Sequence, residues 1–245
     1  MPLTDHQRRR YRRNIDVPGM GERGQERLLA SRVVVIGAGG LGSATLPYLA
    51  AAGVGHITVV DGDVVEEMNL QRQVLHRDLG VNKARSAAET LTRLNPGVEV
   101  TPVEKFLTSE LAAQLFPTAD LVLDCTDQFG AKYLISDAAR AARTPLVWAS
   151  AVGMQGQCSF FGVPDMHGDE LWLRDLHPVE PASGTYPTAQ EIGILGSTVA
   201  QVGTVQVGEA LKFLAGFGEL LVGKLWLLDA AGCRYHVIPF RKRAA

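Results

Sequence analysis

The chain has 245 residues, of which 46% are hydrophobic and 20% are charged, and its formal net charge is -2. This length and composition can bury the core of one α/β domain, or of one domain with an appendage, and they exclude a disordered chain. The near-neutral charge is not that of a general nucleic-acid binder, although Arg8 to Arg13 make one segment locally basic. We therefore expect no nucleic-acid partner.

The apolar segments are too interrupted to predict a membrane span. The stretch from Leu195 to Ala215 contains Gln201, Gln206, Glu209 and Lys212, and no apolar segment of signal-peptide type stands near the N-terminus. We expect a soluble, cytoplasmic protein. Its three cysteines are odd in number, far apart and without a C-x-x-C pair, so reduced thiols are expected and a four-cysteine zinc site is not.

The first predicted strand runs directly into a glycine-rich turn. Residues 4–31 have a polar, helical pattern, and the apolar run Val33 to Ile36 is typical of a buried parallel strand. Gly37, Gly39 and Gly42 follow with the spacing G-x-G-x-x-G. The first glycine permits a tight turn, the second lets the backbone approach a phosphate, and the third lets a helix over residues 43–52 pack closely. This motif predicts a nucleotide without choosing between ATP, NAD and FAD.

A second β-branched strand, His56 to Val60, ends in a carboxylate. Asp61 lies 19 residues beyond Gly42, close to the offset at which an acidic residue reaches a ribose hydroxyl pair. The alternative for Asp61 is a cap or turn residue, although Asp63 could serve as the turn residue instead. The nucleotide interpretation becomes stronger with this carboxylate.

Cations just past the second strand separate ATP from NAD. The segment from Asn69 to Gln73 contains Arg72, and Lys83 follows Gly80. A dehydrogenase does not need two cations here, whereas a triphosphate does, because Arg and Lys offset the charge that develops on leaving pyrophosphate. For either residue alone a surface ion pair is the alternative; their joint position favours phosphate.

The fourth predicted strand, over residues 120–127, carries the next informative carboxylate. It follows a helix over residues 83–94, a strand over 99–103 and a helix over 109–116, which together complete a βαβαβ pattern. Asp127 is placed at the carboxyl end, where the ligand of a doubly wound sheet lies, and is a candidate Mg²⁺ ligand. Asp120 and Asp124 are expected to be structural, and Cys125 to be buried rather than a nucleophile.

The second half predicts more strands around a long loop. Two strands are expected over residues 146–151 and 157–163, a crossing loop over 164–193, a helix over 197–214, and an antiparallel hairpin formed by 224–229 and 235–239. The predicted fold is a Rossmann-like, doubly wound, mostly parallel α/β sheet with an antiparallel C-terminal extension. The hairpin could form a platform for a protein partner.

Taken together, several motifs resemble the MoeB/ThiF family of the ubiquitin-activating superfamily. The resemblance covers nearly the whole chain and rests on motifs at Arg10–Arg13, Gly24-Gln25, Gly37–Gly42, Ala52–Gly55, Asp61–Asp63, Asn69–Gln73, Lys83, Asn95-Pro96, Asp124–Asp127 and Glu209–Lys212. It implies one adenylation domain over residues 1–245, with a nucleotide-binding half at about 1–150 and a half that holds the crossing loop and the carrier site at about 151–245.

The resemblance also implies an activity. It implies a homodimeric enzyme that uses ATP and Mg²⁺ to adenylate the C-terminal glycine of a small ubiquitin-like sulfur carrier ending in Gly-Gly, with no membrane involved. Arg13 would reach across the dimer as an arginine finger, and Arg72, Lys83 and Asp127 would complete the catalytic set. The residues at the nucleotide would be Gly37, Gly39, Gly40, Gly42, Asp61, Asp63, Asn69, Leu70, Arg72, Gln73, Lys83 and Asp127, with Asp127 positioning Mg²⁺.

Two departures from the family pattern concern cysteine. Relatives commonly carry two C-x-x-C pairs that bind zinc, but residues 164–173 and 239–245 contain no cysteine. Many relatives also have a reactive cysteine on the crossing loop, where this chain has Ala189, with Thr185, Tyr186 and Thr188 beside it. We therefore expect no zinc site and adenylation without a thioester or persulfide, the sulfur coming from another protein. Met68 and Gln128 are smaller departures.

Three alternatives remain open at this stage. The adenylated substrate could be a peptide or natural-product precursor, the protein could be a nucleotide-binding scaffold without turnover, or the glycine motif and Asp61 could serve an NAD-dependent oxidoreductase. The sequence does not identify the carrier, the sulfur donor or the pathway, which could make molybdopterin, thiamine, thio-modified tRNA or a specialised metabolite.

Overall fold

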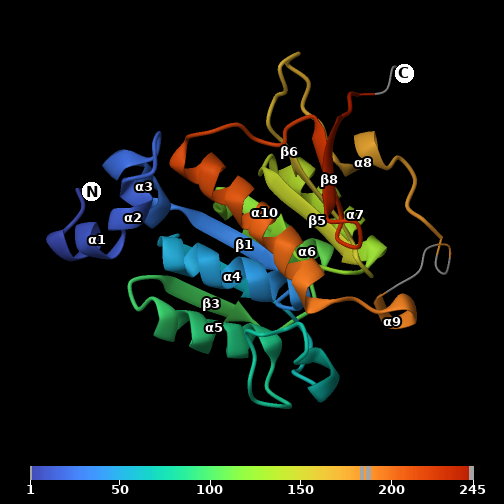
Figure 1. The fold of residues 1–245 in the computed structure, drawn as a ribbon, viewed down its shortest axis with the longest axis horizontal. Coiled ribbons are helices and arrows are strands. Elements are labelled where there is room, and N and C mark those ends of the chain that lie inside the picture. The colour runs from blue at the N-terminus through green and yellow to red at the C-terminus, as the bar shows by residue number, and fades with distance from the viewer. Residues whose placement is uncertain (1, 183–184, 186–188, 243–245) are drawn as a thin grey trace.

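The computed structural model describes residues 2–182, 185 and 189–242, and within them the strands form one mixed sheet (Figure 1). Its strand order is β3-β2-β1-β4-β5-β6-β7-β8. The first five strands pair in parallel and the last three join antiparallel. The strands are β1 (Arg32–Ile36), β2 (His56–Val60), β3 (Glu99–Val103), β4 (Leu121–Asp124), β5 (Leu146–Val152), β6 (Gln155–Phe161), β7 (Lys224–Asp229) and β8 (Arg234–Pro239). The predicted fold class is confirmed.

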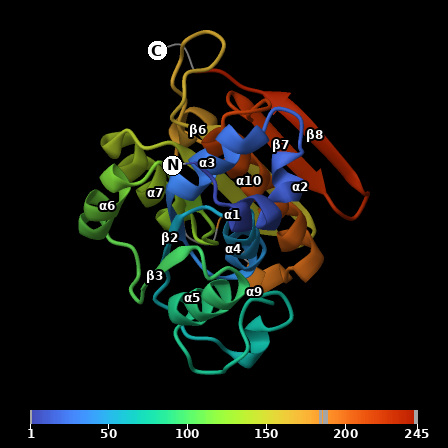
Figure 2. The same cartoon turned by 90° about the vertical axis from the view of Figure 1, so that its left-hand side faces the viewer.

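Helices cover both faces of the parallel part of the sheet (Figure 2). The α-helices of the described residues are α1 (Asp5–Arg10), α2 (Arg12–Ile15), α3 (Gly21–Ala30), α4 (Gly40–Ala52), α5 (Lys83–Leu94), α6 (Ser109–Leu115), α7 (Phe129–Ala142), α8 (Leu173–Leu176), α9 (Ala189–Ile192) and α10 (Gly196–Ala215). Helices α4, α5 and α10 pack on one face, and α6 and α7 pack on the other. None of the described helices is long and apolar enough to cross a membrane.

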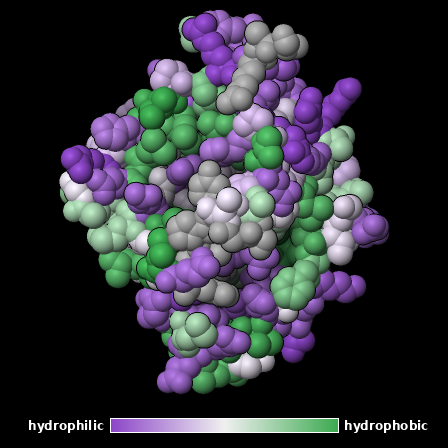
Figure 3. All heavy atoms as spheres, turned by 90° about the vertical axis from the view of Figure 1, so that its right-hand side faces the viewer, coloured by the Kyte–Doolittle hydropathy of each residue, from purple (hydrophilic) through white to green (hydrophobic). Residues whose placement is uncertain are grey.

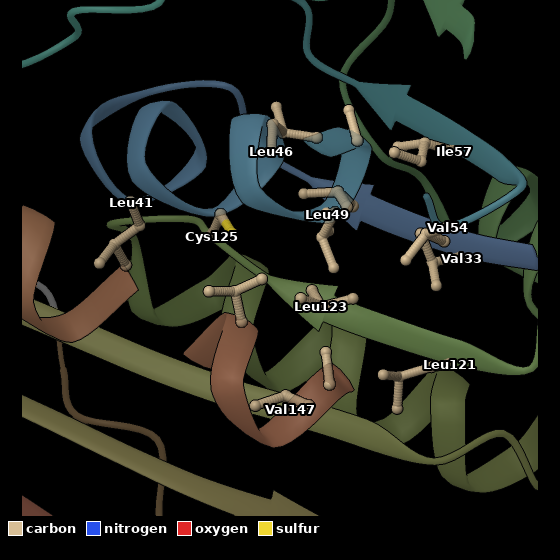
Figure 4. Close-up of a cluster of buried hydrophobic side chains, with 14 of the residues drawn as sticks. Val33, Leu41, Leu46, Leu49, Val54, Ile57, Leu121, Leu123, Cys125 and Val147 are labelled. Carbon is tan, nitrogen blue, oxygen red and sulfur yellow. The ribbon is translucent and has the colours of Figure 1, made fainter. Parts of the chain in front are cut away.

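Alternate residues of β1 enter two different cores. Val33 and Val35 belong to the cluster beneath α4 and α10, while Val34 and Ile36 belong to the cluster beneath α6 and α7. Both faces are buried, which is why the strand has a continuous apolar run instead of alternation. Figure 4 shows the first cluster, in which Cys125 lies among aliphatic side chains, so the expectation that this cysteine is buried is confirmed.

The fourth strand ends earlier than its sequence pattern suggests. We expected residues 120–127, but β4 stops at Asp124. The Asp124 carboxylate accepts hydrogen bonds from the backbone N–H and the hydroxyl of Thr126, at 2.9 and 2.6 Å. This local turn breaks the strand pairing, because an Asp side chain competes with the ladder for nearby N–H groups. Asp127 therefore lies on a loop.

The polar N-terminal segment forms three short helices, α1 to α3. Tyr11, between α1 and α2, is 3% exposed and packs on Gly53, where a Cβ atom would lie 2.6 Å from the ring. Its hydroxyl accepts a hydrogen bond from Asn95 Nδ2 at 2.9 Å. This anchor ties the N-terminal arm to α4 and α5.

The predicted crossing loop joins β6 to α10, and its described residues include the short helices α8 and α9. The Tyr133 hydroxyl lies 2.8 and 2.9 Å from the carbonyl oxygens of His177 and Val179, which attaches the first part of the loop to α7. The surface on this side of the molecule mixes polar and apolar side chains (Figure 3).

Candidate functional site

A cavity of about 650 Å³ lies at the carboxyl ends of β1, β2 and β4. In a doubly wound sheet, the crevice at the carboxyl ends of the strands, where the strand order reverses, is where ligands bind. Here the reversal falls between β1 and β4, which pair side by side. The predicted residues that line this cavity are Gly37, Gly39, Gly40, Asp61, Asp63, Arg72, Gln73, Lys83 and Asp127.

The glycine turn is shaped by close backbone contacts. Gly37 has a φ of +97°, and a Cβ atom there would lie 2.8 Å from the carbonyl oxygen of Cys125. A Cβ atom on Gly42 would lie 2.4 Å from the carbonyl oxygen of Gly37. The first and third glycines thus allow the turn and the start of α4 to pack tightly, which leaves the N-terminal end of α4 pointing at the cavity.

Asp61 is tied to the glycine turn and still reaches the cavity. Its Oδ2 accepts the Ala38 N–H at 2.7 Å, and its Oδ1 accepts the Asp63 N–H at 2.9 Å. Burial raises the pKa of Asp61, and these two N–H groups act in the opposite direction. Asp61 is therefore a turn-organising residue and a cavity residue at once.

Lys83 enters the site from the first turn of α5. The side chain of Asn82 caps this helix by accepting the N–H groups of Ala84 and Arg85. The Lys83 ammonium lies 3.1 Å from Asp63 Oδ2, with 8% of its side chain exposed. Arg72 also lines the cavity and donates from Nη1 to the carbonyl of Met68 at 3.1 Å. The two predicted cations thus line one cavity.

Asp127 is exposed on the loop after β4 and lines the cavity. Buried charged side chains fix the backbone of that loop. Lys132 is 2% exposed and donates to Asp124 Oδ2 at 3.3 Å, to the Thr126 carbonyl at 2.8 Å and to the Ala149 carbonyl at 2.6 Å. The expectation that Asp124 is structural is confirmed by its ion pair with Lys132.

Four predicted residues lie outside the cavity lining of the described chain. Gly42 is buried in the first turn of α4, and the side chain of Asn69 accepts the Glu66 N–H at 3.2 Å. Leu70 follows at the end of the same short helical turn, Glu67–Asn69. Arg13 has 95% of its side chain exposed and lies 3.9 Å from Asp16. Contact with a nucleotide stays a prediction for these four residues, as it does for those that line the cavity.

Gln73 carries a polar atom that fits a ligand. Its side chain is 4% exposed, lines the cavity, and its Oε1 has no hydrogen-bond partner among the described residues. A buried polar atom without a partner costs free energy, which a bound molecule with a donor group would recover. This observation suits the prediction that Gln73 contacts the nucleotide.

Sequence reasoning missed several residues of the site. Lys105, Phe106 and Leu107, on the loop after β3, line the cavity beside Gly62, where a Cβ atom would lie 2.7 Å from the Phe106 ring. Their position after a strand was the available signal. Lys132 and His76 were also missed, because a lone buried Lys or His has no local pattern that distinguishes it.

The described residues contain no group of three or more His, Cys, Asp or Glu side chains that could hold a metal ion. Burial raises the pKa of the Cys125 thiol to about 12 and raises that of Cys158 well above its ordinary value, so neither is a ready nucleophile. Tyr186 and Thr188 of the crossing loop lie outside the described residues. That the chain has no zinc site, and that adenylation proceeds without a thioester or persulfide, therefore stay predictions from the sequence.

The doubly wound sheet, the glycine turn and the switch-point cavity define a Rossmann-type protein with a candidate nucleotide site. The chain belongs to the ThiF family, whose model matches residues 11–245. The predicted family membership is thereby confirmed.

Individual relatives support this assignment. The chain is 46% identical over 235 residues to the "probable adenylyltransferase/sulfurtransferase MoeZ" of Mycobacterium tuberculosis, covering 95% of this chain and 60% of that protein. It is 42% identical over 245 residues to the sulfur carrier protein adenylyltransferase of Thermus thermophilus, covering 99% of this chain and 90% of that protein. Among solved structures, Escherichia coli MccB has the same fold, with a TM-score of 0.82 at 19% identity over 99% of this chain and 72% of that one.

Proposed function

We propose that this chain is an ATP-dependent adenylyltransferase that activates the C-terminal glycine carboxylate of a small ubiquitin-like sulfur-carrier protein. The observation that carries the proposal is the convergence of Arg72, Lys83 and Asp127 on one cavity with the glycine turn. The names of the relatives support the same reaction, since one of them is a sulfur carrier protein adenylyltransferase.

The cavity suggests how ATP would lie. Asp61 would accept hydrogen bonds from the ribose hydroxyls, because each of its carboxylate oxygens keeps a further lone pair beside the one used by a backbone N–H. The phosphates would lie against the glycine turn and the N-terminal end of α4, between Arg72 and Lys83. The base would lie towards Phe106.

Asp127 suits a magnesium ion carried in with ATP. Mg²⁺ is commonly bound by one or two carboxylates together with substrate phosphates, and Asp127 is an exposed carboxylate at the cavity wall. When bound, the ion supplies positive charge next to the phosphates. Asp127 would bind the ion directly. Lys132 would keep the Asp127 loop in place by donating to the Thr126 carbonyl.

The reaction joins two anions, and the protein's task is to hold them together. A carboxylate oxygen of the carrier's last glycine would attack the α-phosphorus, forming a new P–O bond while the bond from that phosphorus to the bridging oxygen breaks and pyrophosphate leaves. Arg72 and Lys83 would offset the repulsion and the charge on the leaving group. The product is an acyl adenylate.

The proposal includes a homodimer in which Arg13 reaches the partner's site. Its side chain is almost fully exposed, and it lies two residues after the anchored Tyr11, so the arm that carries it has a defined origin. In the same proposal the sulfur comes from another protein, since the crossing loop over residues 164–193 contains no cysteine, and the reaction takes place in the cytoplasm.

The direct test is carrier-dependent exchange of pyrophosphate into ATP. We expect exchange with a carrier ending in Gly-Gly, none when those two residues are deleted, and a loss of about 100-fold or more in Asp127→Ala. Asp120→Ala is a matched control, because that carboxylate caps the start of β1 outside the cavity. Folded protein that exchanges with no Gly-Gly carrier would contradict the proposal. Adenylation of a free peptide only, found by mass spectrometry, would replace it with the peptide alternative.

A further inference from the structure

The backbone of Ala38, in the middle of the glycine turn, is held at both its N–H and its carbonyl. The Ala38 N–H donates to Asp61 Oδ2 at 2.7 Å. The Ala38 carbonyl oxygen lies 2.7 Å from His76 Nε2. The N–H contact is made by Asp61, the carboxylate at the end of β2 that the sequence motifs already assign to the site. The carbonyl contact is made by His76, to which neither the sequence motifs nor the proposed reaction assign a role.

The contacts of His76 determine its tautomer. A carbonyl oxygen is only an acceptor, so Nε2 must carry the proton that it donates to Ala38. His76 Nδ1 lies 3.0 Å from the hydroxyl of Ser86, which can donate to it. The imidazole is 4% exposed, and burial lowers its pKa, which favours this neutral form. Asp61 and Lys83 are the charged groups that act on it, in opposite directions.

Ser86 connects this imidazole to the helix that carries Lys83. Ser86 is 8% exposed and lies three residues after Lys83 on α5, so the two side chains are on neighbouring positions of one helix face. The chain of contacts therefore runs from the Ala38 carbonyl through His76 to α5. It joins the turn that would face the phosphates to the helix that supplies one phosphate-binding cation.

We propose that His76 is a positioning residue for the phosphate half of the nucleotide site, holding the glycine turn and the Lys83 helix at a fixed distance. The inference rests on the proposed function only in taking ATP as the ligand. Without the donor at Nε2, the Ala38 carbonyl loses its buried partner and the turn can rotate its N–H groups away from the phosphates. The ribose contact of Asp61 does not depend on that donor.

The two amide residues separate the two contacts of the imidazole. In His76→Gln the side-chain N–H₂ can take the place of Nε2–H and donate to Ala38. In His76→Asn the shorter side chain can reach only the position of Nδ1, so the Ala38 carbonyl is left without its donor. Comparing these variants tests the Nε2 contact with two substitutions of similar chemistry.

The experiment measures the binding of ATP and of adenosine to the full chain by calorimetry. We expect His76→Asn to weaken ATP binding about tenfold, which is about 1.4 kcal/mol, and to leave adenosine binding within about twofold, because the variant loses one buried hydrogen bond on the phosphate side of the site. We expect His76→Gln to bind ATP within about twofold of the unsubstituted protein. Ser86→Ala should give an intermediate loss for ATP alone.

The outcomes that overturn the inference differ from those that overturn the function. Equal ATP affinity in His76→Asn, or an equal loss for ATP and adenosine, would show that His76 has at most a general structural role. A folded unsubstituted protein that binds adenosine but not ATP would instead contradict the proposed function. If His76→Asn does not fold, Ser86→Ala and His76→Gln decide, since a loss for ATP in Ser86→Ala is still required.

Discussion

At the scale of single residues, the loop that presents Asp127 takes its shape from a lysine with no surface role. Lys132 brings its ammonium to two backbone carbonyls and to Asp124, and it lies 5.7 Å from the centre of the Trp148 ring. A buried lysine is costly unless every one of its donors finds an acceptor. Here the three contacts meet that condition and fix the loop after β4.

Replacing Lys132 with methionine keeps much of the volume and removes the charge. We expect a loss of about 3–5 kcal/mol in the free energy of unfolding, because Asp124, which is 0% exposed, is left without its countercharge. Urea unfolding measures this loss. Lys132→Met combined with Asp124→Asn should recover part of it; a single variant as stable as the unsubstituted protein would show that the pair contributes nothing.

At the scale of elements, α10 lies against α4, directly behind the glycine turn. Gly203 makes this close approach possible, because a Cβ atom there would lie 2.7 Å from the Cβ atom of Ala44 and 3.0 Å from the carbonyl of Leu41. Gly40, at the start of α4, similarly faces Val199 of α10. The position of the phosphate-facing end of α4 thus depends on how α10 packs.

Two glycines of α10 provide a matched pair of substitutions. Gly203→Ala should destabilise the protein by about 1–3 kcal/mol through overpacking against α4. Gly208→Ala has no atom within 4 Å of the new Cβ and should stabilise it by about 0.5–1 kcal/mol through helix propensity. Thermal or urea unfolding of both variants measures the difference. Equal effects at the two positions would mean that the α4–α10 contact does not limit packing.

At the scale of the whole molecule, the free energy of unfolding should depend on pH through the buried His76. Burial lowers the pKa of His76 below its ordinary value of 6.5 in the folded protein. Between that lowered value and 6.5 the unfolded chain binds more protons than the folded one, so the free energy of unfolding rises with pH in this window. The stability that depends on a neutral His76 is therefore fully present above pH 6.5 and is lost as the pH falls from 6.5 to the lowered pKa of the folded protein.

His76→Gln removes this titration while keeping the hydrogen bond to Ala38. We expect the stability of the unsubstituted protein, relative to this variant, to fall as pH decreases below about 6.5 and then to level off. Urea unfolding of both proteins from about pH 5 to about pH 8 measures the relative stability. His177, whose pKa is also lowered by burial, is common to both proteins and cancels. Parallel curves would mean that His76 titrates alike when folded and unfolded.

Mixed dimers can distinguish a site that is shared between two subunits from a site that is formed by one subunit alone. If Arg13 acts in the partner's site, Arg13→Ala and Asp127→Ala are each inactive alone, but a mixed dimer has one site with both residues. Random mixing should then restore about one quarter of the exchange activity. Co-expression of differently tagged chains tests this. Two inactive variants that stay inactive in verified mixed dimers would place Arg13 in its own subunit's chemistry.

The amino-acid sequence by itself determined the elements whose signals are local. The apolar run Val33 to Ile36, the glycines that follow it and the carboxylate at Asp61 each depend on neighbours in the chain, and the structure has them as expected. The antiparallel hairpin and the long crossing loop were also predictable, because turn residues and strand patterns mark them. The boundary at Asp124 was not, since it depends on a side chain competing for backbone N–H groups.

Only the tertiary structure decided which residues act together. Asp63 with Lys83, Asp124 with Lys132, and Ala38 with His76 are brought into contact by the packing of helices on the sheet. A lone histidine or lysine has the same appearance in a sequence whether it is buried or solvated. Its role depends on which helix face it occupies and on which strand ends converge beside it, and those are properties of the folded chain.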